Sequence, residues 1–231
     1  YVSKADFTSA TFGNITSGGI TGSASSPLPI FPAGWAVTSE ILVQASTSCP
    51  TVDAGTGLVH DPSPAPGINW SGCDLTGADL AGQDLAGAQF VTSVMTDASL
   101  ISSNIINANF TGANLLRLKL NAATGNGAAF NYATGGQWNA TGATLDSADF
   151  DHTNIGYSTL TDASLQEGNF NYGTLVGSTL DSARFDNARF LRTLLSTANI
   201  DSTKFTSATF QFIRGIGPVS YTHLRAHETR E

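Results

Sequence analysis

A large apolar residue recurs at every fifth position of this chain, from Trp70 to Phe210. An amphipathic helix has an apolar period of about 3.6 residues and a half-buried strand a period of about 2, so a period of five fits neither. A chain with this pattern has to turn a corner every five residues and point side chains inward each time. Only Gly125, Gly135 and Ala140 interrupt the series. The period therefore predicts a solenoid with short sides.

Every fourth member of the series is aromatic. Four sides of five residues form one square coil, and identical sides then stack at the spacing of neighbouring strands, about 4.8 Å. The aromatic residues are expected to form an internal ladder of rings in offset contact. The series has 29 positions from 70 to 210, and four positions to a coil give about seven coils. The ladder comprises Trp70, Phe90, Phe110, Phe130, Phe150, Phe170, Phe190 and Phe210.

The segment CDLTGADLAGQDLAGAQF, residues 73–90, resembles the consensus of the pentapeptide-repeat family. The resemblance extends over residues 68–212. It implies an all-β fold, a right-handed quadrilateral parallel β-helix whose interior holds each large residue and the small residue two positions before it, such as Ala78 or Ala88. The family is functionally mixed, so the resemblance implies a fold and leaves the function open.

Residues 121–140 depart from the pattern. Gly125 and Gly135 leave two interior sites without a large side chain, while Trp138 occupies a small-residue site and Ala140 a large one. Either the exchange conserves interior volume, or the coil bulges and Trp138 turns outward. We favour a locally repacked coil. Leu118 overfills another small site, which the glycines would relieve.

The N-terminal segment carries the same period in another phase. Phe7 and Phe12 each follow an alanine by two positions, so residues 1–12 are expected to be the end of an earlier coil. Residues 13–67 then interrupt the repeat with turn-rich stretches and a strand-like run at 35–43. With SGGITG at 17–22 and FPAGW at 31–35, this segment resembles the SGGITG…LPAGW insertion of some secreted or surface bacterial members of the family.

This insertion is interpreted as a hairpin followed by a loop, which either leaves the rod or covers its open end. The exposed end of a β-helix has to be capped to avoid pairing with other strand edges. In the second case, the apolar residues of the cap are Trp35, Ile41 and Leu42.

The two cysteines, Cys49 and Cys73, flank a proline-rich loop. In an extracellular protein they would close a disulfide, whereas in a cytosolic protein they would be separate thiols. Cys73 occupies an interior small-residue site, which suits a plain buried thiol equally well. Both interpretations stay open at the level of the sequence.

The C-terminal segment, residues 213–231, lacks the repeat after Gly217-Pro218. Its run at 219–229 resembles a translated sequencing adapter of the kind found at the ends of metagenomic contigs. We therefore expect this tail to be non-native or disordered, and we assign no function to His223 or His227.

Sequence patterns for chemistry are missing: there is no nucleophile elbow, zinc-ligand spacing, phosphate loop or dinucleotide fingerprint. We expect no enzymatic activity, no catalytic residue, no cofactor and no metal site. His60 lies in the proline-rich loop without a nucleophile near it in sequence. Asp181 and Asp201 share a register on consecutive coils, but two carboxylates are too few to hold calcium.

One outward column of the C-terminal coils is aromatic and basic. Its members each follow a ladder phenylalanine by two positions, and we call them the stripe. Exposed aromatic side chains are typical anchors for a partner, so the stripe could stack on sugar rings or contact a protein. Alternatively, these side chains lie across the rung and shield it. The stripe comprises Tyr132, His152, Tyr172, Arg192 and Phe212.

Composition narrows the function classes. The chain has 18 acidic and 10 basic residues, a formal net charge of −8, which disfavours a general nucleic-acid binder. No apolar run reaches the about 18 residues that a membrane-spanning helix needs. The polar, weakly charged exterior favours a non-enzymatic structural or adhesive rod, a fragment of a secreted or surface bacterial protein. We expect an extracellular or cell-surface location, with the cytoplasm as the alternative, and a protein or glycan partner.

The resemblance also implies an alternative function, because some pentapeptide-repeat proteins mimic DNA and bind type II topoisomerases. Residues 73–210 carry the net negative charge that mimicry requires. That charge is diluted by basic residues concentrated in the last coils, so we rank mimicry second. The basic residues in question are Arg184, Arg189, Arg192 and Lys204.

Overall fold

The computed structural model describes residues 35–38, 41–44 and 49–213, which fall into two compact units, 1–48 and 49–231. In the first unit, β1 (Trp35–Thr38) and β2 (Ile41–Gln44) pair as an antiparallel hairpin within the run predicted to be strand-like. The expected earlier coil at 1–12 and the tail from 214 onward lie outside the described residues. The capping role of Trp35, Ile41 and Leu42 stays a prediction.

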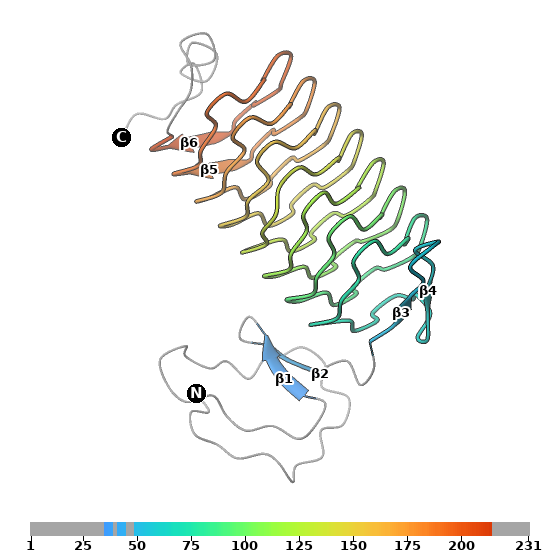
Figure 1. Ribbon diagram of the computed structural model, residues 1–231. Coiled ribbons are helices and arrows are strands. Elements are labelled where there is room, and N and C mark those ends of the chain that lie inside the picture. Colours follow the sequence, from blue (N-terminus) through green and yellow to red (C-terminus); the bar gives the residue numbers. More distant parts are fainter. Residues whose placement is uncertain (1–34, 39–40, 45–48, 214–231) are drawn as a thin grey trace. The chain divides into compact units, whose positions relative to one another are not determined.

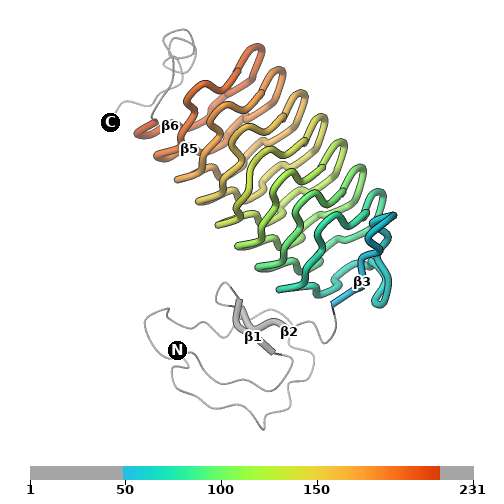
Figure 2. Tube along the Cα trace, viewed as in Figure 1, coloured from blue at the N-terminus to red at the C-terminus, as the bar shows by residue number. Residues whose placement is uncertain are grey.

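The second unit is a parallel β-solenoid with a 20-residue coil. Successive β-bridges join Asn69 to Gln89, Gln89 to Asn109 and Asn109 to Ala129, all parallel. At the other end, β5 (Arg189–Leu191) and β6 (Thr209–Gln211) pair in the same register. The coils lie side by side in chain order (Figures 1 and 2). Among the described residues there is no helix, so none that could cross a membrane.

Backbone hydrogen bonds connect each coil to both of its neighbours. Leu75 N donates to Val94 O at 2.7 Å, and Val94 N donates back to Cys73 O at 2.9 Å. The corners are closed locally, as where Asp74 Oδ1 accepts a hydrogen bond from Thr76 N at 3.0 Å. Short polar side chains favour such turns, which explains why Asp, Asn and Thr recur just before each large residue.

The interior holds the ladder. Its seven phenylalanines lie face to face between consecutive coils, with ring centroids 4.9 Å apart for Phe90 and Phe110 and 4.8 Å apart for Phe190 and Phe210. All are at most 2% exposed. Trp70 meets Phe90 edge-on at 5.9 Å and begins the series. One continuous apolar core therefore runs through the rod.

Trp138 points into the rod. Its side chain is 2% exposed and its ring centroid lies 5.4 Å from that of Phe130. The indole Nε1 donates to Gly135 O at 2.9 Å, which pairs the buried N–H. Gly135 and Ala140 provide the space that the indole fills, so the coil is repacked. At Gly125, a Cβ would lie 2.7 Å from Ile105 Cγ1, because neighbouring coils have closed over that site.

The N-terminal end of the rod is covered by a short hairpin. β3 (Thr51–Val52) pairs antiparallel with β4 (Val59–His60), and Val52, Val59 and Ile68 pack against the core. Asp79 N donates to Gly57 O at 2.7 Å, which ties the hairpin to the first coil. Residues 49–67, predicted to belong to the insertion, are thus in the same unit as the rod.

A disulfide joins Cys49 to Cys73, with the Cα atoms 5.4 Å apart. It links the start of this hairpin segment to the first coil. Cys73 is 1% exposed at the predicted interior site. Of the two interpretations left open by the sequence, the structure has the bonded one.

Candidate functional site

The five residues of the stripe form one continuous stack on an edge of the rod. The ring of His152 lies between Tyr132 and Tyr172, with centroids 4.9 and 4.7 Å away and planes within 16° and 14° of parallel. Each member occupies a corner with a positive φ, from 55° to 60°. Because the coils repeat at strand spacing, corner side chains of this register are brought face to face.

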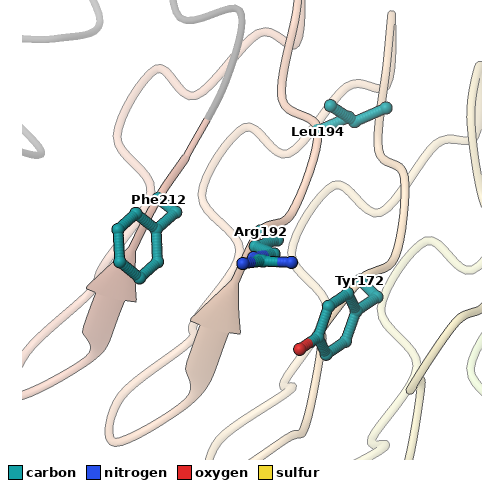
Figure 3. Close-up of a pocket in the computed structure, with 4 residues that line it drawn as sticks. All are labelled: Tyr172, Arg192, Leu194 and Phe212. Carbon is teal, nitrogen blue, oxygen red and sulfur yellow. The ribbon is translucent and has the colours of Figure 1, made fainter.

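The cation at the C-terminal end of the stripe continues the stack. Arg192 Cζ lies 5.9 Å from the ring centroid of Tyr172 and 5.8 Å from that of Phe212, close enough for cation–π attraction. With Leu194, these three residues line a hollow of about 470 Å³ (Figure 3). Phe212 is 71% exposed and Leu194 is 40% exposed, so an apolar edge stands in solvent here.

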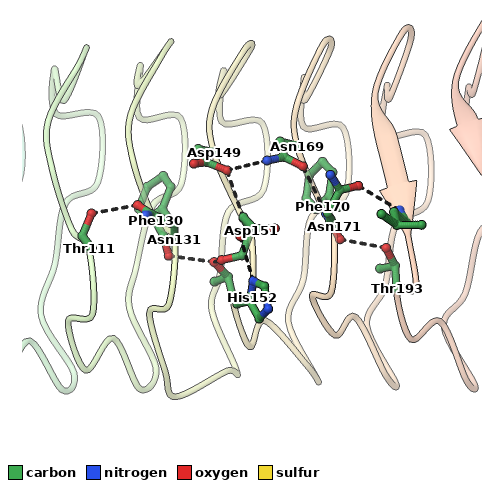
Figure 4. Close-up of polar contacts among 12 residues, drawn as sticks. Thr111, Phe130, Asn131, Asp149, Asp151, His152, Asn169, Phe170, Asn171 and Thr193 are labelled. Carbon is green, nitrogen blue, oxygen red and sulfur yellow. Dashed lines mark hydrogen bonds and ion pairs between the residues drawn. The ribbon is translucent and has the colours of Figure 1, made fainter. Parts of the chain in front are cut away.

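The middle of the stripe is held by polar contacts with the neighbouring side of the coil (Figure 4). His152 Nδ1 lies 2.7 Å from Asp151 Oδ2. Asp149 Oδ1 accepts from Asp151 N at 3.1 Å and from Asn169 Nδ2 at 2.9 Å. Thr193 Oγ1 donates to Phe170 O at 2.7 Å, which fixes the chain next to Arg192.

This stacking limits what the stripe can bind. Both faces of His152 are covered by tyrosines, and one face of each tyrosine is covered in turn. What reaches solvent is a ridge of ring edges, phenol hydroxyls and a guanidinium, with Tyr132 54% and Tyr172 44% exposed. Such a ridge suits a protein surface, whose apolar groups and acceptors it can meet. Most of its ring faces are taken up by the stack itself, so edges and polar tips, more than open faces, are presented to a partner.

The other sequence candidates are not assembled into a site. His60 is exposed on β4. The described part of the chain contains no group of three or more His, Cys, Asp and Glu side chains that could hold a metal ion.

Perturbed carboxyl groups lie instead in surface contacts. Hydrogen bonding from Arg117 lowers the pKa of Asp97, and hydrogen bonding from Thr76 lowers that of Asp74. Burial raises the pKa of Asp186, but hydrogen bonds from Thr206 and Arg184 outweigh it and the net direction is downward. The hydrogen bond at Asp74 closes a corner, and those at Asp97 and Asp186 join neighbouring coils.

Residues 73–115 match the family model described as pentapeptide repeats, in eight copies. No curated protein matches the chain. Among solved structures, HetL, a pentapeptide-repeat protein involved in heterocyst differentiation regulation from Nostoc sp. strain PCC 7120, is 19% identical, with 62% of this chain and 87% of that one covered and a TM-score of 0.27.

Two further structures are similar. QnrB1, a plasmid-mediated fluoroquinolone resistance protein, is 16% identical over 69% of this chain and 93% of that one, with a TM-score of 0.45. AT2G44920, a pentapeptide-repeat protein of the Arabidopsis thaliana thylakoid lumen, is 26% identical over 46% of this chain and 66% of that one, with a TM-score of 0.24.

Proposed function

We propose that this chain, whose residues 73–115 are pentapeptide repeats, is a non-enzymatic rod with a structural or adhesive role. It is a fragment of a secreted or surface bacterial protein and forms a right-handed β-helix of about seven coils. The observation that carries the proposal is the uninterrupted core, closed at its N-terminal end by a disulfide-linked hairpin. In the described coils the interior is filled by the rod's own side chains, so reactants have no room inside it, which favours a scaffold over an enzyme.

The disulfide supports a location outside the cytoplasm. Cystines persist in oxidising compartments and are rare among reduced cytosolic proteins. The Cys49–Cys73 bond closes a separation of 24 residues at the end of the rod, where the strand edges most need protection. A cytoplasmic location would leave the same two residues as free thiols.

The stripe is the surface through which the rod contacts a protein partner. Tyrosine, phenylalanine and arginine are enriched where proteins meet, and here they are aligned along one edge. Tyr132, Tyr172 and Phe212 are all exposed, although all the large side chains of the ladder are buried. The partner surface is expected to offer acceptors for the guanidinium of Arg192.

Adhesion can be tested with beads that carry the purified chain through a biotin at its N-terminus. Saturable attachment to immobilised matrix proteins or bacterial cell-surface fractions is expected. A triple variant Tyr132→Ser, Tyr172→Ser and Phe212→Ser should reduce attachment at least fivefold. The matched control replaces three exposed corner serines, Ser147, Ser182 and Ser202, by alanine. Equal attachment by both variants, or attachment to none of these surfaces, overturns the adhesive role.

DNA mimicry has less support from the charge distribution. Arg117 pairs with Asp97 at 2.6 Å and Arg184 with Asp186 at 3.0 Å, so part of the negative surface is neutralised locally. Arg192 adds a positive charge on the stripe. A gyrase supercoiling assay separates the two functions, because a mimic inhibits supercoiling at stoichiometric amounts whereas an adhesive rod leaves it unchanged.

A further inference from the structure

The face that follows the stripe's corner along the chain contains a hollow that no sequence pattern pointed to. In its outward column, Gly136 and Gly156 follow each other on consecutive coils, between Leu116 below and Val176 above. A groove of about 400 Å³ is lined by these two glycines and bounded at one corner by Tyr157. This volume is in the range of small-molecule sites, about 300–1,000 Å³.

The groove lies next to Trp138, whose buried indole donates to Gly135 O at 2.9 Å. A Cβ on Gly135 would lie 2.6 Å from Leu116 N, and one on Gly136 would clash with Gly156 O. In the described part of the chain no bridge joins Thr134 to the coil above. The floor is thus bare backbone, and only glycine fits at positions 135 and 136.

The polar lining of the groove is neutral. Gln137 N donates to Gly156 O at 2.8 Å. The side chain of Gln137 is exposed, and its amide lies at the rim. Asn154 Oδ1 accepts from Gly156 N at 3.0 Å. Among the described residues, neither amide NH2 group has a hydrogen-bond acceptor. No charged side chain lines the groove.

Tyr157 supplies an aromatic surface that the stripe does not. Its ring is 69% exposed and, among the described residues, stacks on no other ring. One part of the ring rests on Gly177, where a Cβ would lie 2.7 Å from Cδ1 and Cε1. The backbone of Gly177 thus supports the ring while the rest stays open to solvent.

We propose that this groove binds a neutral carbohydrate, one or two pyranose units in size. The apolar face of a pyranose would lie on the ring of Tyr157, and its hydroxyls would accept from and donate to the amides of Gln137 and Asn154. The glycine floor lets the sugar approach the backbone closely. Because the lining carries no charge, an acidic sugar or a phosphate finds no counter-ion here. The site goes beyond the proposed function and holds wherever the rod resides.

The test is a titration of the isotope-labelled chain with maltose, cellobiose, lactose and chitobiose, followed by amide NMR. Saturable shifts are expected for at least one of these sugars at Gly135, Gly136, Gln137 and Asn154, including the side-chain amides. Tyr157→Ser should weaken the affinity at least tenfold. Gly156→Ala, which adds a methyl group to the floor at 3.3 Å from Asn154 Oδ1, should do the same.

Tyr172→Ser is the matched control, because it removes an exposed tyrosine of the stripe and should leave the affinity unchanged. Unaltered backbone spectra outside the groove establish that each variant is folded. The proposal is overturned if none of the four sugars causes saturable shifts, if Tyr157→Ser and Gly156→Ala bind as the parent does, or if Tyr172→Ser weakens binding equally. The bead assay tests adhesion through the stripe, whereas this titration tests sugar binding in the groove, so either proposal can be overturned without the other.

Discussion

The corners of the first coils and those of the later coils solve the same backbone problem differently. Every corner has a positive φ, and from 67 to 87 all five corner residues are glycine. From residue 92 onward most corner residues carry a side chain, and those of the stripe are among them. A left-handed conformation costs an L-residue about 1–2 kcal/mol, which glycine avoids. The first five corners are therefore relaxed and bare, whereas most of the later ones are strained and carry side chains.

At the later corners, backbone strain lowers local stability, but the same corners present side chains to solvent. Aromatic pairs contribute about 0.5–1.5 kcal/mol beyond their burial, so stacking of Tyr132, His152 and Tyr172 offsets part of their strain. Both the stripe and the groove lie among the later coils, where most corners are strained. Strain at such corners is a reason to look for binding there. The five glycine corners from 67 to 87 then serve as the internal control.

The largest effect is expected from the core, where positions along the rod should not differ. Phe110→Ala and Phe170→Ala each remove a fully buried ladder ring and leave a cavity, so each should lower the free energy of unfolding by about 3–5 kcal/mol. Urea denaturation followed by circular dichroism measures both. A clearly smaller loss at one of these positions would mean that the ladder is not equally packed along the rod.

The disulfide should have the next largest effect, confined to the N-terminal end. Cys49→Ser breaks the bond at its exposed cysteine. In the unfolded state, the chain between the two cysteines, which are 24 residues apart, then regains its conformational entropy. A loss of about 2–4 kcal/mol is expected. Thermal denaturation with and without dithiothreitol measures it, and the variant should no longer respond to the reductant. Hydrogen exchange should increase at β3 and β4 while the coils around Phe170 keep their protection.

Corner substitutions should act in opposite directions at the glycine corners of the first coils and at the non-glycine corners of the later ones. Gly77→Ala meets no atom within 4 Å, so its cost of about 1 kcal/mol is conformational alone. Ser182→Gly removes the same strain from an exposed corner and should stabilise the rod by about 0.5 kcal/mol, since glycine has its own entropic cost. Tyr132→Gly should gain less than Ser182→Gly, because it also loses the stack on His152. Urea midpoints decide the order.

The smallest effect is a pH dependence at a surface pair. Arg117 Nε donates to Asp97 Oδ1 at 2.6 Å and holds the pKa of Asp97 below its usual value in the folded chain. Ionised Asp97 therefore contributes stability above the carboxyl's unfolded pKa, and this contribution is lost as the pH falls through the lower folded pKa. Asp97→Asn should flatten the acid limb of a plot of urea midpoint against pH. High salt should weaken the difference, since both side chains are nearly half exposed.

The five-residue period alone gave the solenoid and the residues that line it, because a corner at every fifth residue leaves only certain side chains facing inward. It also put the stripe in one register. The departures at Gly125, Gly135, Trp138 and Ala140 were visible in the sequence, but volume arguments allowed Trp138 to point either way. Glycines at 136 and 156 share an outward register, a signal that could have located the groove.

Only the tertiary structure decided the features that depend on distances between coils. The disulfide required Cys49 to meet Cys73, and the cap required β3 and β4 to fold onto the first coil. The rings of the stripe cover one another because their planes are nearly parallel, which depends on side-chain orientation and not on register alone. Periodicity specifies which way a side chain points, since that is a property of one coil. Whether it then stacks, pairs or leaves a hollow depends on the coils above and below.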